Sequence, residues 1–216
     1  MSFSDEPSKP RPRKRRTQEQ RSAETRALLL DVTIDCLAEL GHTRTTAQTI
    51  ADRAGLSRGA QLHHFGSRTR LLTAAMEHVF ERGNRQFRSL LAEMPENQDP
   101  VSYSFGALWR VVSGPVGHAY LELVFAARND PELHRAMVEA NRRNDEQVDV
   151  TFREYLQGKV DTGISFDILW TAVFALFEGL VVEKVMRRDD ARIDRVVETL
   201  KRLAPSIVLR RPPHLS

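Results

Sequence analysis

Cationic and hydrogen-bonding side chains are concentrated in one short stretch of the chain, residues 45–68. A guanidinium group such as that of Arg58 donates two parallel hydrogen bonds, so it suits phosphate oxygens or the O6 and N7 acceptors of guanine. His63 and His64 are adjacent and have no further histidine or cysteine at metal-ligand spacing, so we expect no metal site there. These residue types predict recognition of an anionic partner rather than bond-breaking chemistry.

The sequence shows no signature of enzymatic catalysis. It contains no HExxH, CxxC, GxSxG or phosphate-loop pattern, and no carboxylate pair stands beside a histidine at an informative helical spacing. The single cysteine, Cys36, permits no internal disulfide and falls on an apolar stripe, which indicates a packed thiol rather than a redox centre. We therefore expect no catalytic residue, cofactor or metal.

The N-terminal residues 1–20 form a strongly basic segment. Residues 1–68 hold twelve Lys and Arg against eight Asp and Glu, whereas the rest of the chain is close to neutral. Pro10 and Pro12 interrupt the basic run and favour extended backbone, so the segment is predicted to be a disordered arm. Such an arm suits phosphate contacts, an anionic lipid surface or simple solubilisation. Its consecutive cations are Arg13, Lys14, Arg15 and Arg16.

Helical periodicity predicts an all-α chain. Apolar residues recur every three or four positions, and no segment alternates convincingly with a period of two. Thr45 and Gln48 stand at capping-box spacing, and Pro205 is expected to stop the last helix. About nine helices are expected, over residues 21–40, 45–54, 57–64, 67–90, 101–113, 115–128, 130–157, 165–187 and 190–204.

Residues 46–65 fit a helix-turn-helix. Ala51 is small where the two helices would cross, Gly55 permits a sharp turn, and Ser57 is placed to cap the second helix. The capped N-terminus carries free N–H groups and the positive end of the helix dipole, which favour a phosphate or a base edge. The arrangement predicts a helix that enters the major groove of DNA.

Residues 21–85 resemble the DNA-binding domain of the TetR family of bacterial transcriptional regulators. The shared features run in order from a glycine that ends the first helix to a Leu-Leu pair in the fourth. They are Gly41, Thr45-Thr46, Ile50-Ala51, Ala54-Gly55-Leu56-Ser57, His63-His64-Phe65-Gly66-Ser67 and Leu71-Leu72. Three positions depart from the family pattern, since Gln61 replaces an apolar residue, Leu62 an aromatic residue and Arg68 a lysine.

The resemblance implies that the second helix of the motif reads DNA. Arg58 is the candidate to bind a guanine, or alternatively a phosphate, and Gly59 and Ala60 would let the backbone approach closely. The basic arm would lie in the adjacent minor groove. Besides the four arm residues, the expected DNA contacts are Thr45, Thr46, Gln48, Ser57, Arg58, Gly59, Ala60, Gln61, His63, His64 and Arg68.

Residues 86–216 are expected to form an effector-binding and dimerisation domain. Aromatic side chains in its predicted helices either line a largely apolar effector pocket or belong to the core. These candidates are Trp109, Tyr120, Phe125, Trp170, Phe174 and Phe177, and the polar candidates to orient a ligand, face solvent or pair across an interface are His118, Glu122 and Glu178. The apolar faces of 165–187 and 190–204 predict a four-helix interface between two copies.

Together with the resemblance, these features predict a cytoplasmic, homodimeric repressor that a small, largely apolar effector releases from a palindromic DNA operator. An activator, or a regulator without an effector, is an alternative of the same fold. An all-α enzyme with an incidental basic arm would lack a catalytic motif. A peripheral membrane protein would lack an apolar insertion face beside the arm, and no stretch approaches the ~20 apolar residues of a membrane span.

Overall fold

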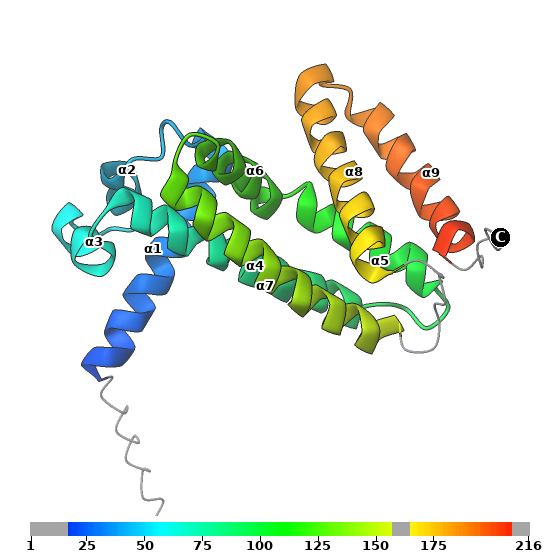
Figure 1. The fold of residues 1–216 in the computed structure, drawn as a ribbon, viewed down its shortest axis with the longest axis horizontal. Helices are drawn as coiled ribbons and strands as arrows, with labels where there is room; N and C mark the ends of the chain where they lie inside the picture. Colours follow the sequence, from blue (N-terminus) through cyan, green and yellow to red (C-terminus); the bar gives the residue numbers. More distant parts are fainter. Residues whose placement is uncertain (1–16, 157–164, 209–216) are drawn as a thin grey trace, which may run out of the picture.

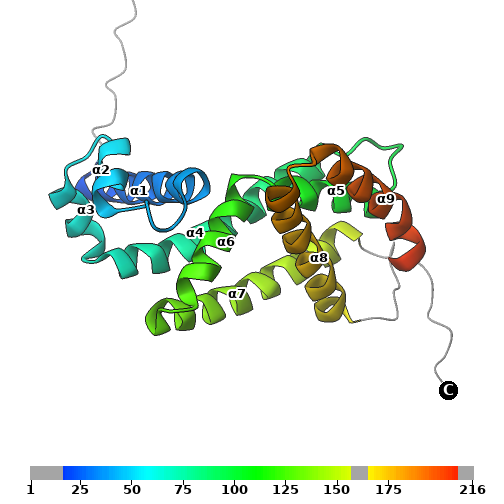
Figure 2. The ribbon, with the colours of Figure 1, turned by 90° about the horizontal axis from the view of Figure 1, so that it is seen from above.

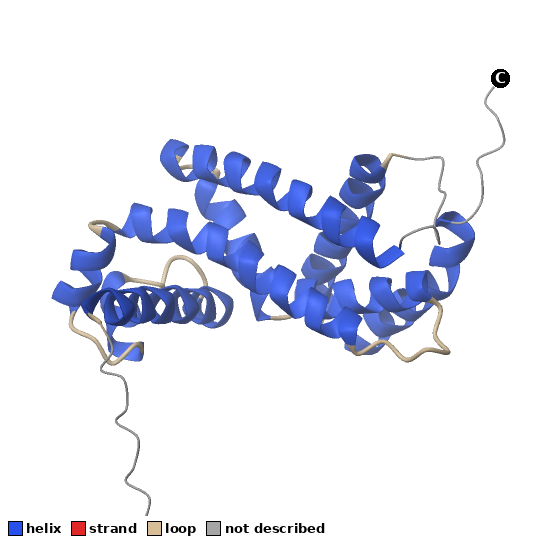
Figure 3. Ribbon diagram, turned by 90° about the horizontal axis from the view of Figure 1, so that it is seen from below, coloured by secondary structure: helices blue, strands red, loops and turns tan. Residues whose placement is uncertain are grey.

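The computed structural model describes residues 17–156 and 165–208, and every regular element within these ranges is a helix (Figure 3). The elements are α1 (Gln18–Leu40), α2 (Ala47–Arg53), α3 (Arg58–Phe65), α4 (Arg68–Ala92), α5 (Pro100–Val112), α6 (Pro115–Ala127), α7 (Pro131–Leu156), α8 (Phe166–Arg187) and α9 (Asp190–Val208). The prediction of an all-α fold is confirmed. The predicted arm contacts, Arg13 to Arg16, lie outside the described residues.

The helices divide into two regions joined by α4. α1, α2 and α3 gather at one end of the molecule, and α8 and α9 form an antiparallel pair at the other end (Figure 1). α4 runs from the first end towards the second and packs against α7 (Figures 1 and 2). We call α1–α3 with the first turns of α4 the head, and the rest of α4 with α5–α9 the bundle.

Each region has its own buried cluster. The head cluster combines α1, α2, α3 and α4, through Leu29, Leu30, Cys36, Ile50, Phe65, Leu71 and Ala75. The larger cluster lies in the bundle and also receives Ile34 and Leu37 from α1, which packs against α6. Cys36 is a free, fully buried thiol, and this burial raises its pKa. The head is therefore fixed both by its own core and by contact of α1 with the bundle.

α1 begins earlier than predicted, at Gln18 rather than at residue 21. The reason is a reciprocal capping box. The Thr17 hydroxyl oxygen accepts the N–H of Gln20 at 3.2 Å, and the Gln20 side-chain oxygen accepts the N–H of Thr17 at 3.0 Å. Two of the free donors at the helix start are thereby satisfied, so residues 17–20 belong to the head and not to the arm.

α2 begins at Ala47, two residues later than the predicted start at residue 45. Its N-cap is Thr46, whose hydroxyl oxygen accepts the N–H of Thr49 at 3.1 Å. The predicted box of Thr45 and Gln48 does not form, because the buried Thr45 hydroxyl donates instead to the carbonyl of Gly41 at 2.8 Å. Two adjacent threonines made both registers chemically acceptable, and burial of Thr45 decides between them.

α9 continues through Pro205 to Val208, although the sequence predicted a stop at the proline. A proline inside a helix has no N–H for the carbonyl four residues earlier, which here is that of Lys201. The hydroxyl of Ser102 in α5 donates to this carbonyl at 3.0 Å. A donor from the neighbouring helix thus replaces the missing backbone bond, and packing of α5 on α9 overrides the local signal.

Candidate DNA interface and effector cavity

The α2–α3 pair has the geometry of a helix-turn-helix. Gly55 adopts a φ of 67°, in the left-handed region that favours glycine, and turns the chain between the helices. The N–H of Leu56 then bonds back to the carbonyl of Ala51 at 2.9 Å, which closes the turn. Ile50 and Ala51 are fully buried beneath it. These contacts fix the direction in which α3 leaves the turn.

The N-terminus of α3 is capped and open to solvent. The Ser57 hydroxyl oxygen accepts the N–H of Ala60 at 3.1 Å, as its position in the sequence predicted. Arg58 and Gly59 are exposed in the first turn. A positive dipole end, free N–H groups and a guanidinium are therefore presented together, the combination that binds phosphate and guanine edges.

The flanking polar residues lie on the same exposed part of the head. Thr46 and Gln48 are exposed on α2, where the Gln48 amide donates to an Asp52 carboxylate oxygen at 2.7 Å. His63 is exposed and His64 is half-buried, and their rings meet edge to face at 5.6 Å. These positions leave the expected DNA contacts of these four residues sterically available.

Two of the expected DNA contacts are corrected by the structure. Thr45 is fully buried, so its side chain does not reach a phosphate. Gln61 is also 0% exposed, because its position on α3 points into the head, where the family pattern has an apolar residue. Neither amide atom of Gln61 has a hydrogen-bond partner among the described residues.

Arg68 is already engaged inside the protein. Its Nη2 donates to the carbonyl of His42 at 2.8 Å, and its Nε donates to the carbonyl of Thr45 at 3.2 Å. Arg68 was expected to bind a phosphate, and these two bonds to the α1–α2 loop leave that contact a prediction. Arg68 therefore braces this loop against the start of α4.

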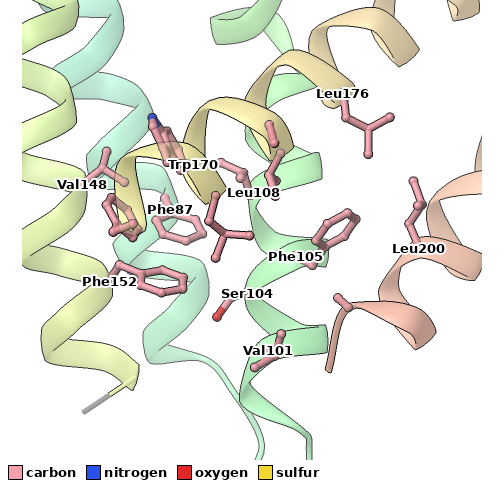
Figure 4. A pocket seen from close by; sticks show the side chains of 15 residues that line it. Phe87, Val101, Ser104, Phe105, Leu108, Val148, Phe152, Trp170, Leu176 and Leu200 are labelled. Atoms are coloured by element: carbon pink, nitrogen blue, oxygen red, sulfur yellow. The ribbon is translucent and has the colours of Figure 1, made fainter. Parts of the chain in front are cut away.

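An apolar cavity of about 230 Å³ opens between α4, α5, α7, α8 and α9 (Figure 4). Its walls carry no charged side chain, and they include aromatic rings from four of these helices. The lining residues are Phe87, Val101, Ser104, Phe105, Leu108, Val148, Phe152, Phe166, Leu169, Trp170, Ala172, Val173, Leu176, Leu200 and Ala204. The hydroxyl of Ser104 donates to the carbonyl of Pro100 at 2.7 Å, so the main polar group in the wall is already partnered.

A second, smaller cavity of about 50 Å³ lies nearer the head. It shares Phe87, Leu108, Val148 and Trp170 with the larger cavity, and α6 contributes Val116, Gly117 and Tyr120 to its wall. The Tyr120 hydroxyl donates to Asn141 at 3.3 Å. Burial, followed by the nearby Glu178 carboxylate, raises the pKa of Tyr120 to about 12, so this phenol stays neutral.

Three of the six predicted pocket aromatics line these cavities. Trp170 lines both, and Tyr120 and Phe174 line the smaller one. The other three are corrections. Phe177 is a fully buried core residue, with its ring centroid 4.5 Å from that of Phe105.

Trp109 and Phe125 lie apart from both cavities. Trp109 packs its ring on Phe177 at 5.5 Å and borders a polar groove between α5 and α9. Phe125 is 59% exposed on α6, because its position faces outwards on that helix. The sequence showed that α6 and α8 are rich in apolar residues, but it did not show which side of each helix the bundle covers.

An aromatic ladder on α8 forms one wall of the cavities. The rings of Phe166, Trp170 and Phe174 stack in sequence, at 6.2 and 5.3 Å between centroids. The indole N–H of Trp170 donates to an Asp145 carboxylate oxygen at 3.2 Å, which fixes the ring. Burial raises the pKa of Asp145. The four-residue spacing of this ladder was visible in the sequence, but its partner Asp145 on α7 was not.

The three polar candidates in the bundle lie in different surroundings. Burial raises the pKa of the Glu178 carboxyl beside the ladder. Burial, followed by the charge of Lys184, lowers the pKa of His118. Glu122 points away from the cavities, towards the head, where it accepts the N–H of His42 at 2.6 Å. The sequence offered no signal for this contact, which joins residues 80 positions apart.

Comparison with known proteins decides the family. The head matches the family model described as bacterial regulatory proteins, tetR family, over residues 29–75, and the bundle matches BetI-type transcriptional repressor, C-terminal, over residues 117–209. The HTH-type transcriptional regulator CymR of Pseudomonas putida is 30% identical over 187 residues, which cover 85% of this chain and 90% of CymR. The chain belongs to the TetR family of transcriptional regulators.

One further sequence relative and two solved structures are similar to the chain. HTH-type transcriptional regulator BetI of Paraburkholderia xenovorans is 31% identical over 55% of this chain and 62% of BetI. A solved TetR-family regulator from Rhodococcus sp. superposes with a TM-score of 0.65 at 17% identity, over 87% of this chain and all of that one. A transcriptional regulator from Saccharomonospora viridis, solved in complex with choline, gives 0.65 at 17% identity, over 88% of this chain and all of that chain.

This TetR-family chain is a DNA-binding transcriptional regulator and not an enzyme. Among the described helices, none is long and apolar enough to cross a membrane. The described residues also contain no group of histidine, cysteine and carboxylate side chains able to hold a metal ion. The candidate functional sites are the exposed α2–α3 face of the head and, separate from it, the apolar cavity of the bundle.

Proposed function

We propose that the chain is a homodimeric, cytoplasmic repressor that leaves a palindromic operator when a small, largely apolar compound fills the cavity of the bundle. The observation that carries this proposal is the position of α4. Its first residue, Arg68, braces the head, and Phe87 on the same helix lines the cavity. A compound that moves Phe87 therefore acts on the element that holds the DNA-binding helices.

The DNA side of the proposal rests on the exposed N-terminus of α3. Arg58 reads a guanine and Gly59 and Ala60 allow close approach, while Thr46 and Gln48 contact phosphates and fix the register. A single α3 offers few base contacts. Two copies that read half-sites roughly 34–36 Å apart would supply the affinity and require a palindromic operator.

The dimer side rests on α8 and α9. α8 carries apolar side chains on its solvent side, among them Ile168, Val185 and Met186, which are 61, 67 and 73% exposed. Leu203 of α9 is likewise about half exposed. Exposed apolar groups of this size on one antiparallel helix pair suit a four-helix interface with a second copy.

The cavity favours a neutral compound with one ring. Apolar cavities of about 150 Å³ admit benzene, and the larger volume here leaves room for a short alkyl group. The walls offer no charged partner, so a charged group inside would pay an uncompensated desolvation penalty. The choline in the Saccharomonospora viridis structure is a cation, and it provides a comparison ligand of different charge.

The proposal of a repressor depends on how effector binding and DNA binding are coupled. An effector changes DNA affinity only by as much as it prefers one dimer geometry over the other. The similarity of residues 117–209 to BetI-type repressors supports release from DNA as the response. An activator of the same fold would show tighter operator binding in the presence of the effector.

Fluorescence anisotropy tests this function. The duplex is taken from the region upstream of the gene that encodes the chain, with a scrambled duplex as control, and both are measured with ethylbenzene, with choline and without ligand. We expect tight, salt-dependent binding to the upstream duplex and a rise in its Kd with ethylbenzene on the order of 5–150-fold. No binding at low salt, or a response to choline alone, would overturn the proposal.

A cavity-filling variant sharpens the test. Val173→Phe places a ring in the wall of the cavity, so ethylbenzene should neither bind by calorimetry nor shift the operator Kd. Val138→Phe makes the same change at an exposed position of α7, and it should respond like the wild type. An ethylbenzene response retained by Val173→Phe would place the effector elsewhere.

A further inference from the structure

One residue of the α1–α2 loop, His42, is held through its backbone from two sides. Its N–H donates to Oε2 of Glu122 in α6 at 2.6 Å, and its carbonyl accepts Nη2 of Arg68 in α4 at 2.8 Å. Both bonds are partly buried and both use a charged side chain, the type that contributes most among hydrogen bonds. Glu122 of the bundle and Arg68 at the start of α4 thus hold the peptide groups that lead into the helix-turn-helix.

The local backbone explains why a carboxylate sits there. α1 ends at Leu40, and Gly41 turns the chain with a φ of 77°, so the His42 N–H cannot continue the helical bonding. A partly buried N–H needs an acceptor, and Glu122 supplies it. A Cβ on Gly41 would lie 3.4 Å from Oε2 of Glu122, an ordinary van der Waals distance, so the glycine is favoured here by its positive φ and not by the carboxylate.

From His42 the bonding continues to the start of α2. The Thr45 N–H and hydroxyl both donate to the carbonyl of Gly41, at 3.2 and 2.8 Å, and the Thr45 carbonyl accepts Nε of Arg68 at 3.2 Å. The next residue, Thr46, is the N-cap of α2. Glu122 is therefore connected to the start of α2 through the hydrogen bonds of His42, Arg68 and Thr45 and the backbone that joins Thr45 to Thr46.

The same helix that carries Glu122 also borders the smaller cavity. Tyr120, two residues before Glu122, lines that cavity with Val116 and Gly117. Its ring lies 5.7 Å from that of Phe174 on the aromatic ladder, measured between centroids. α6 therefore contacts the smaller cavity through Tyr120 and the α1–α2 loop through Glu122, so a shift of α6 changes both contacts.

We propose that Glu122 is a positioning residue that transmits occupancy of the larger cavity to the helix-turn-helix, by way of the wall shared with the smaller cavity, α6 and the backbone of His42. With Arg68 it holds the α1–α2 loop in the arrangement that places α2 and α3 on the operator. This route runs beside the one through α4. The inference rests on the proposed function, since it concerns how an effector bound in the bundle changes DNA affinity.

The test compares Glu122→Leu, which removes the acceptor, with Glu122→Gln, which keeps an acceptor oxygen without the charge. Glu132→Leu at an exposed position in the first turn of α7 is the matched control. For each full-length variant, ethylbenzene binding is measured by calorimetry without DNA, and the operator Kd is measured with and without ethylbenzene.

We expect Glu122→Leu to bind ethylbenzene like the wild type and to lose about tenfold in effector-free operator affinity. The ratio of its two operator Kd values should fall below about twofold, while Glu122→Gln recovers most of the wild-type ratio. A loss of stability alone would not change this ratio. An unchanged ratio in Glu122→Leu would overturn the proposal.

The outcome also separates the two proposals. If the wild type binds the operator but does not respond to ethylbenzene, the proposed effector class fails. The role of Glu122 is then judged on effector-free operator affinity, which must drop in Glu122→Leu and recover in Glu122→Gln. Equal affinity in these two variants would overturn the positioning role.

Discussion

The head and the bundle hold their functional residues in place by different means. In the head, the side chains that start α2, α3 and α4 bond within three residues of themselves, as Thr46, Ser57 and Ser67 show. In the bundle, one cavity draws its walls from five helices, with Phe87 and Ala204 at its sequence limits. A DNA-binding surface is thus specified locally, whereas the cavity exists only after the helices have packed.

The largest effect that would sharpen this comparison is expected at Arg58. Arg58→Ala should lose about 1–3 kcal/mol of discrimination between the operator and a guanine-substituted duplex, because a bidentate contact is removed. The two Kd values are measured by anisotropy at fixed salt. Arg85→Ala, an exposed arginine of α4, is the control. Unchanged discrimination with uniformly weaker binding would make Arg58 a phosphate contact.

An effect of similar size, on stability and of opposite sign, is expected at Gln61. Its buried amide has no partner among the described residues, so Gln61→Leu should raise the free energy of unfolding by about 1–3 kcal/mol. Denaturant titration measures this change. Gln48→Leu, at an exposed position, is the control, and its change in the free energy of unfolding should be near zero. A destabilised Gln61→Leu would mean that the amide is satisfied, and the local picture of the head would be incomplete.

The smallest effect tests the bundle. Ser102→Ala should cost about 1 kcal/mol, because the Lys201 carbonyl loses its donor. In a Pro205→Ala background the helix supplies an N–H of its own, so the same change should cost measurably less. A double-mutant cycle by denaturant titration gives the coupling between the two residues. Zero coupling would show that Ser102 does not compensate for the proline.

The sequence predicted what depends on neighbouring residues. The helices, the turn at Gly55 and the caps at Ser57 and Ser67 follow from residue type and spacing, because their partners lie within one turn. The family pattern, which has an apolar residue at position 61, indicated that Gln61 is buried, whereas its polar side chain suggested exposure.

Contacts between distant residues were beyond reach. Whether Phe125 faces the core or solvent depends on how α6 rotates against α1 and α4, and periodicity along one helix does not determine that rotation. The pairing of Glu122 with His42 and of Ser102 with Lys201 likewise requires the packed helices. For the same reason, the sequence could not show which residues line the cavities, because the cavities form between packed helices.

The buried thiol of Cys36 gives the head a reporter of its own. It is the chain's single cysteine and is fully buried in the head cluster, so an alkylating reagent reaches it only when α1 separates from its neighbours. The labelling rate, relative to that of the unfolded chain, is therefore a direct measure of how often the head opens. Operator DNA should slow this labelling, and no cysteine needs to be introduced to follow it.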